Sequence, residues 1–262
     1  MTALVETRLM PLANASLCAQ IRLSAPRANA LEPNLMTALH AALDQAEQHD
    51  AKVILLSGGR AFPSGGDVAR FYEAARNGAE AARAYADRVV PPLQALVLRL
   101  VSMPRLVAVA ANGAITGGAA GLLFASDLAI LSPTAFIQPY YSAVGFAPDG
   151  GWTALLPHRI GAGRTLSWLH SNERVDARDA VGLGLAEQVS DHPLDAARDR
   201  LAHGNLNAHL TAKALIWDGP RLATLSRRLE AETAAFRDRI GQPDVLDGMR
   251  AFLTPDQAID HV

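Results

Sequence analysis

Cysteine, long apolar runs and clusters of positive charge are scarce in this chain of 262 residues. The single cysteine, Cys18, excludes an internal disulfide and is typical of a reducing compartment. No apolar run approaches the roughly 20 residues of a membrane-spanning helix, and residues 1–10 lack a charged start followed by an apolar stretch. We therefore expect a soluble, cytoplasmic protein with no membrane partner.

Charge and histidine spacing exclude two further kinds of partner. The formal net charge is −2 at pH 7 and no Lys- or Arg-rich run is present, so the chain offers no electrostatic footprint for nucleic acid. Its eight histidines contain no His-x-x-x-His pair, and His158 and His170 are too far apart to share one helical face. We expect neither a nucleic-acid partner nor a metal site.

The first half of the chain predicts an alternation of strands and helices. Residues 15–23 carry apolar side chains at alternate positions, as a half-buried strand does. Pro33 then opens a helix with one apolar face. Residues 52–57 and 106–111 are short apolar runs, as in strands that are buried on both faces, and residues 127–131 predict a further strand.

Helices dominate the second half, and one long helical pattern precedes it. That pattern covers residues 82–100 and contains a Pro-Pro pair that should kink or restart the helix. Later helical segments begin near Gly150, Arg164 and Asp176, and one long apolar face carries Leu222, Leu225, Leu229 and Phe236. We expect an α/β core over residues 1–190 and a helical C-terminal region over residues 191–262.

Two glycine-rich loops each join a predicted strand to a predicted helix. The first loop, residues 61–68, reads Ala-Phe-Pro-Ser-Gly-Gly-Asp-Val. Its small residues let a ligand approach the backbone, and amide N–H groups at a helix start are free to bind negative charge. The alternative is an ordinary loop in which Asp67 only stabilises the first turn of the helix.

The second loop, residues 112–121, reads Asn-Gly-Ala-Ile-Thr-Gly-Gly-Ala-Ala-Gly. It does not match Gly-x-Gly-x-x-Gly, and no Lys-Ser/Thr pair follows it, so neither a dinucleotide nor a nucleoside triphosphate is indicated. Close packing of a helix on the sheet is the alternative explanation for its glycines.

Together the two loops resemble those of the crotonase superfamily, the enoyl-CoA hydratase/isomerase family. Its members carry a Phe-x-small-Gly-x-Asp loop and an Asn-Gly-x-x-x-Gly-Gly loop in this order and at this separation, and the resemblance runs from about Ala15 to Phe252. It implies an α/β fold, a crotonase-like spiral of repeated β-β-α units with a helical C-terminal part. It also implies trimers or dimers of trimers, to which residues 191–262 contribute while closing the pocket. Coenzyme A is expected as part of an acyl-CoA substrate, with no permanently bound cofactor.

The resemblance also implies roles for individual residues. The backbone N–H groups of Gly66 and Gly118 fall where the family binds the thioester oxyanion. The expected substrate contacts are Ser64, Gly65, Asp67, Gly117, Tyr141, Arg27, Ala28 and Ala30. A solvated surface position is the alternative for Arg27. Removing a proton beside a thioester, or adding a nucleophile to a conjugated one, places negative charge on that oxygen. Two preorganised donors there lower the barrier by roughly 3–4 kcal/mol each, without a metal.

Hydratases of the family use two glutamates, and this sequence has neither. The first position is Gly121, and the second falls at Tyr141 or Ser142. None of these side chains holds or deprotonates water as a carboxylate does, which disfavours hydration.

Asp149 is the candidate catalytic carboxylate. It lies in residues 144–152, Val-Gly-Phe-Ala-Pro-Asp-Gly-Gly-Trp, which are similar to the Gly-x-x-Pro-Asp/Glu-Gly segment of the family's isomerases. One carboxylate suffices to move a proton between two carbons, and such catalysis contributes typically ~10²–10⁴ in rate. The alternatives are a cap on a helix that begins at Gly150, or a nucleophile as in the family's aromatic dehalogenases. Tyr140 and Tyr141 either supply a phenolic proton or pack against the acyl group.

We therefore expect an enoyl-CoA isomerase that uses Gly66, Gly118 and Asp149. Hydration, or another crotonase-type reaction on an acyl-CoA thioester, is the alternative enzyme activity. A third hypothesis is a non-catalytic protein that binds CoA esters, which the missing glutamates favour and the retained Asp149 opposes.

Overall fold

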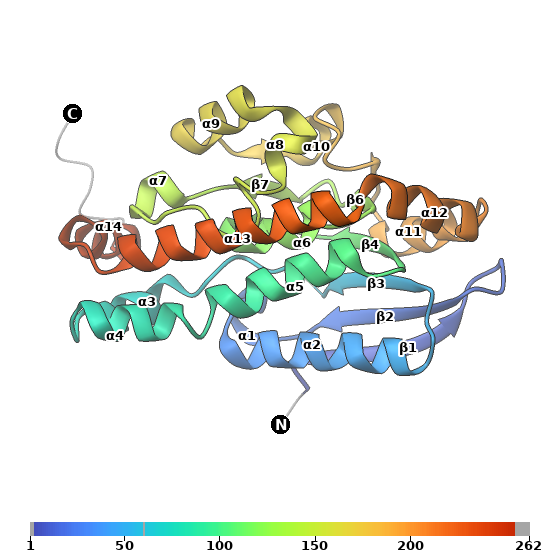
Figure 1. Cartoon of the computed structure of the whole chain (residues 1–262), viewed down its shortest axis with the longest axis horizontal. Coiled ribbons are helices and arrows are strands. Elements are labelled where there is room, and N and C mark those ends of the chain that lie inside the picture. The colour runs from blue at the N-terminus through green and yellow to red at the C-terminus, as the bar shows by residue number, and fades with distance from the viewer. Residues whose placement is uncertain (1–2, 60, 255–262) are drawn as a thin grey trace.

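The computed structural model describes residues 3–59 and 61–254, and its strands form two sheets (Figure 1). The larger sheet has the order β1-β2-β3-β4-β6-β9, with β1 antiparallel to β2 and every other neighbouring pair parallel. Its strands are β1 (Val5–Pro11), β2 (Leu17–Leu23), β3 (Val53–Gly58), β4 (Leu106–Ala111), β6 (Leu128–Leu131) and β9 (Gln188–Val189). A smaller sheet has the order β5-β7-β8, from β5 (Ala114–Thr116), β7 (Phe136–Gln138) and β8 (Val175–Asp176).

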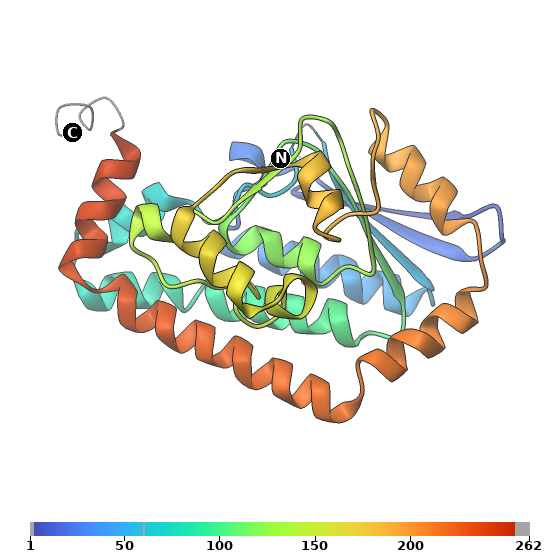
Figure 2. The ribbon, with the colours of Figure 1, turned by 90° about the horizontal axis from the view of Figure 1, so that it is seen from above.

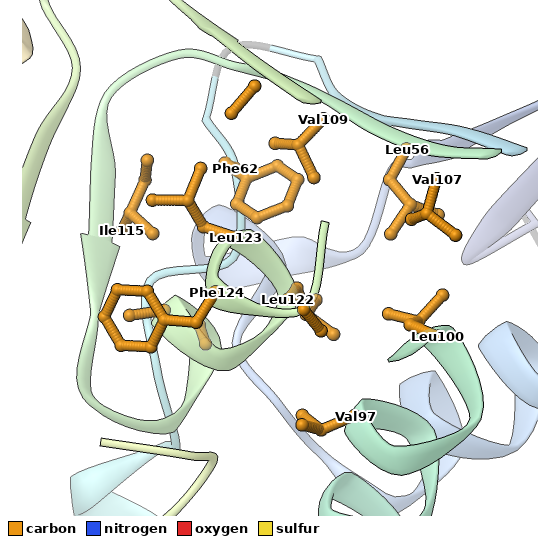
Figure 3. Close-up of a cluster of buried hydrophobic side chains, with 14 of the residues drawn as sticks. Leu56, Phe62, Val97, Leu100, Val107, Val109, Ile115, Leu122, Leu123 and Phe124 are labelled. Atoms are coloured by element: carbon orange, nitrogen blue, oxygen red, sulfur yellow. The ribbon is translucent and has the colours of Figure 1, made fainter. Parts of the chain in front are cut away.

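Helices cover both faces of the larger sheet. Along β3, Ile54 and Leu56 belong to the main core with residues of α2 (Pro33–Gln48), α5 (Val90–Ser102) and α6 (Ala120–Phe124). The alternate residues Val53 and Leu55 pack with α11 (Pro193–Leu201). Every residue of β3 is therefore buried, which explains its continuous apolar sequence. Figure 3 shows part of the main core, with Phe62 of the first glycine-rich loop among the side chains of β4 and α6.

Among the remaining helices, α13 is the longest. These helices are α1 (Pro26–Asn29), α3 (Val68–Ala75), α4 (Ala79–Ala86), α7 (Tyr141–Val144), α8 (Leu156–Ile160), α9 (Ala162–Ser171), α10 (Ala177–Gly182), α12 (Leu206–Ile216), α13 (Gly219–Ile240) and α14 (Pro243–Leu253). Helix α13 packs against α4 and α5 and runs along one side of the molecule, with α14 turning back from its C-terminal end (Figure 2). The C-terminal region thus packs against helices from the first half of the sequence. Its last residues, 255–262, lie outside the described part.

Most of the predicted elements are present. The Pro-Pro pair restarts the helix as expected, because α4 ends at Ala86 and α5 begins at Val90. The helix predicted from Gly150 is wrong. The chain turns there, and α8 begins only at Leu156, because Gly150 and Gly151 adopt positive φ angles of 65° and 97°. No helix within residues 3–59 and 61–254 is long and apolar enough to cross a membrane.

Candidate active site

The two glycine-rich loops lie against each other. The Phe62 N–H donates to the Asn112 carbonyl at 2.7 Å, and the Thr116 hydroxyl donates to the Ser64 carbonyl at 2.6 Å. Gly65 has φ +92°, and a β-carbon there would lie 2.8 Å from the Thr116 carbonyl oxygen. Only glycine therefore fits at the contact between the loops.

The segment around α1 borders the first loop on its other side. Leu31 N–H donates to the Gly65 carbonyl at 2.8 Å, and Ser64 N–H donates to the Ala28 carbonyl at 3.1 Å. Ala28 therefore supports the loop through its backbone and does not line the cavity, whereas Arg27 and Ala30 do line it. The predicted contact of Ala28 with substrate stays a prediction.

Both expected oxyanion donors border one cavity of about 400 Å³. Neither the Gly66 nor the Gly118 N–H has a backbone acceptor among residues 3–59 and 61–254, so both groups are available to a ligand. The predicted residues that line this cavity are Arg27, Ala30, Ser64, Gly65, Gly66, Asp67, Gly117, Gly118, Tyr141 and Asp149. The rest of the wall is mainly apolar and includes Phe71, Leu93, Val144, Phe146 and Phe236.

Asp149 places its carboxylate directly beside one of the two donors. A β-carbon at Gly118 would lie 2.9 Å from each of its carboxylate oxygens. Its side chain is only 6% exposed, and Tyr141 donates a hydrogen bond of 2.6 Å to Oδ1. Oδ2 is therefore the oxygen that a substrate can approach.

The environment of Asp149 raises the pKa of its carboxyl into the neutral range. Burial raises the pKa of its carboxyl to about 7, the negative charge of Glu232 adds to the rise, and the hydrogen bond from Tyr141 opposes it. Burial together with the neighbouring Asp149 carboxylate raises the pKa of Tyr141 well above its usual range, so this phenol stays neutral and donates. A carboxyl that titrates near pH 7 can both take and return a proton.

Asp149 is not a helix cap. No helix begins at Gly150, and the carboxylate accepts from the Tyr141 side chain, not from the backbone N–H groups that follow it. The turn at residues 150–155 therefore contradicts the alternative in which Asp149 caps a helix that begins at Gly150.

The turn after Asp149 also fills the space of the missing first glutamate. A β-carbon at Gly121 would lie 1.9 Å from the Gly150 carbonyl oxygen, and a β-carbon at Gly150 would lie 2.3 Å from the Gly118 carbonyl oxygen. No side chain fits at position 121 unless this turn moves. The other hydratase position falls at Tyr141 or Ser142, and the Tyr141 phenol is bound to Asp149.

Glu232 is a residue of the site that sequence reasoning missed. It lies on α13, is 4% exposed, and accepts hydrogen bonds from the turn that follows Asp149. The sequence did contain a signal, because Glu232 lies three residues after Leu229 and four before Phe236, on the apolar face of the predicted long helix. A charged residue on such a face needs buried partners.

Asp67 and Arg27 are paired at the edge of the cavity. The Asp67 carboxylate accepts from the N–H groups of Ala69 at 3.1 Å and Arg70 at 3.3 Å, which confirms that it caps α3. Arg27 Nε lies 3.1 Å from the same carboxylate, and the Arg27 side chain is about half exposed, at 51%. Among the described residues, no group of three or more His, Cys, Asp or Glu side chains is arranged to hold a metal.

This fold and cavity define a crotonase-type protein with two backbone donors and, beside one of them, the buried carboxylate of Asp149. A family model described as enoyl-CoA hydratase/isomerase matches residues 13–258. The chain belongs to the enoyl-CoA hydratase/isomerase family and is an enzyme of that family. The resemblance and the fold class expected from the two loops are thus confirmed.

Several relatives carry functional names. A probable enoyl-CoA hydratase of Rhodobacter capsulatus is 31% identical over 236 residues, which cover 86% of this chain and 86% of that protein. A trans-2-decenoyl-(acyl-carrier-protein) isomerase of Streptococcus mutans is 30% identical over 184 residues, with coverages of 67% and 68%. A crystal structure of an enoyl-CoA hydratase from Bacillus halodurans has a TM-score of 0.83 at 22% identity, covers 95% of this chain and 99% of its own, and shows the fold alone.

Proposed function

We propose that this protein is an enoyl-CoA isomerase. It moves the double bond of an acyl-CoA thioester from between C3 and C4 to between C2 and C3. The observation that carries the proposal is the position of Asp149: one buried carboxylate lies beside the Gly118 donor, and the turn after it closes position 121. Asp149 is then the single acid/base of the site. One acid/base suffices for a double-bond shift, whereas the family's hydratases use two glutamates to add water.

The reaction proceeds through an enolate. The Asp149 carboxylate takes a proton from C2 of a 3-enoyl thioester, and the electron pair moves onto the thioester oxygen to form a dienolate. The N–H groups of Gly66 and Gly118 stabilise that oxygen. The Asp149 carboxylic acid then returns the proton to C4, and the double bond lies between C2 and C3. Atoms and charge balance without another reactant.

Tyr141 orients the acid/base in this mechanism. Its hydroxyl holds Oδ1 at 2.6 Å, so Oδ2 faces the carbon chain, and its raised pKa keeps it a donor throughout the cycle. The tyrosine therefore contacts the catalytic carboxylate, in addition to lining the cavity as expected.

The acyl group is proposed to extend toward an aromatic cluster. Phe71, Phe146 and Phe236 line the cavity and contact one another, with ring centroids 5.1 to 5.5 Å apart. An apolar acyl chain buries its surface there, while the CoA portion lies at the Ser64 and Arg27 side of the same cavity. Coenzyme A enters and leaves as part of the substrate.

The experiment follows the thioester α-proton by NMR in deuterated buffer. Wild type and Asp149→Asn each receive 3-enoyl-CoA and 2-enoyl-CoA. We expect isomerisation and α-proton exchange in wild type and their loss in the variant, with acyl-CoA binding retained. Equal activity in the variant contradicts the role of Asp149, formation of a 3-hydroxyacyl-CoA indicates hydration, and binding without turnover in wild type indicates a non-catalytic protein.

A further inference from the structure

Glu232 clamps the turn that follows the catalytic carboxylate. Its Oε2 accepts from the Gly151 N–H at 2.7 Å, and its Oε1 accepts from the Thr153 N–H at 2.6 Å, the Thr153 hydroxyl at 2.7 Å and the Ala154 N–H at 2.9 Å. Hydrogen bonds to an ionised group are about twice as strong as neutral ones, so four of them on one carboxylate make a rigid anchor.

The clamped turn is the part of the chain that fixes Asp149. Gly150 follows Asp149 directly, and its carbonyl packs against Gly121 while its α-carbon packs against Gly118. Gly151 and Gly150 both have positive φ, a backbone form that needs support from its surroundings. Glu232 supplies that support from α13, about 80 residues further along the chain.

Glu232 also brings a second negative charge close to Asp149. The titratable groups that act on Asp149 within the described residues are Tyr141 of α7 and Glu232 of α13. Arg27 and Asp67 line the same cavity and are paired with each other, and Leu93 of α5, which lies against Gly118, is apolar. Burial raises the pKa of Glu232, while its four donors stabilise the charged form.

We propose that Glu232 is a positioning residue for Asp149, which holds the turn that presents this carboxylate and places a second negative charge behind it. The inference rests on the proposed role of Asp149 as acid/base. It makes α13 a part of the catalytic apparatus, although Glu232 is not among the residues that line the cavity.

The test separates the charge of Glu232 from its shape. Glu232→Gln removes the charge and keeps the length, and Glu232→Asp keeps the charge and shortens the side chain. Glu230→Gln is the matched control, because Glu230 lies on the same helix, is exposed, and accepts only from Ser226 among the described residues. Circular dichroism and thermal melts confirm that each variant is folded.

The first measurement is the titration of Asp149 by ¹³C NMR of selectively labelled aspartate, with Asp149→Asn identifying the signal. We expect a midpoint near pH 7 in wild type and in Glu230→Gln, and a lower midpoint in Glu232→Gln, because a like charge has been removed. This readout does not require turnover, so it tests Glu232 even if the isomerase proposal fails.

The second measurement is the pH profile of isomerisation. The acid limb of kcat/KM should move to lower pH in Glu232→Gln together with the titration. In Glu232→Asp the midpoint should stay near wild type while kcat falls by up to about 100-fold with little change in KM, the size expected for an ångström-scale misplacement. An unchanged Asp149 midpoint in Glu232→Gln, or an unchanged kcat in Glu232→Asp, overturns the inference.

Discussion

Gly121→Ala is the sharpest test of the geometry around Asp149. The added β-carbon would lie 1.9 Å from the Gly150 carbonyl oxygen and 3.0 Å from Cγ2 of Val97, which belongs to the core in Figure 3. Contacts under 3.0 Å are not tolerated, so the turn after Asp149 must retreat by at least about 1 Å.

The expected magnitude follows from two opposing effects. Overpacking costs about 1–3 kcal/mol and occasionally more, whereas glycine to alanine in a helix returns up to about 1 kcal/mol. We expect a net loss of about 2 kcal/mol in the free energy of unfolding. We also expect a fall of about 100-fold in kcat, because Asp149 moves with the turn.

Urea unfolding followed by circular dichroism measures the first quantity, and the NMR isomerase assay measures the second. Gly163→Ala is the control, because Gly163 lies in α9 with no atom within 4 Å of an added β-carbon, and it should leave kcat unchanged with stability equal or slightly higher. A Gly121→Ala protein with wild-type stability and wild-type kcat would refute the close packing of this turn.

Three further changes test the charge and shape of the cavity. Tyr141→Phe removes the 2.6 Å hydrogen bond that lowers the pKa of Asp149, so the acid limb of the pH–rate profile should move to higher pH. Phe236→Ala should cost about 3–5 kcal/mol by urea unfolding and favour longer acyl chains in kcat/KM. Asp149→Asn should be more stable than wild type at pH 8. The pKa of Asp149 is about 7 in the folded protein, against an ordinary 3.8 in the unfolded chain. Between pH 4 and pH 7 the folded wild type therefore binds a proton that the unfolded chain has lost, and its stability falls as pH rises. The loss is up to about 4 kcal/mol, from about 1.36 kcal/mol per pKa unit, and pH-dependent urea unfolding measures it.

Local sequence patterns predicted the elements and loops that carry their own signal. The apolar run at residues 106–111 is β4, and Pro33 is the first residue of α2. The two glycine-rich loops and Asp149, although far apart in sequence, border one cavity as the family resemblance implied. Their roles in catalysis, the trimer and the cytoplasmic location stay predictions.

The turn at Gly150 was missed because two rules compete at that position. An Asp before a predicted helix is typical of an N-cap, while a Gly-Gly pair is typical of a turn. The turn wins because both glycines adopt positive φ and because Glu232 satisfies the N–H groups of Gly151, Thr153 and Ala154. That partner lies 78 to 81 residues away, a separation that no local pattern encodes.

Gly121 and Tyr141 are the two departures from the hydratase pattern that are linked through Asp149. With the turn in its present position, a glutamate at 121 has no room, because the Gly150 carbonyl occupies the place of its β-carbon. At position 141 a second carboxylate would face Asp149 in a buried space, where two like charges resist ionisation together, whereas the Tyr141 phenol is a donor and holds one carboxylate oxygen. Restoring a single glutamate should therefore not restore hydration. A hydratase site here requires that the turn, residue 121 and residue 141 change together.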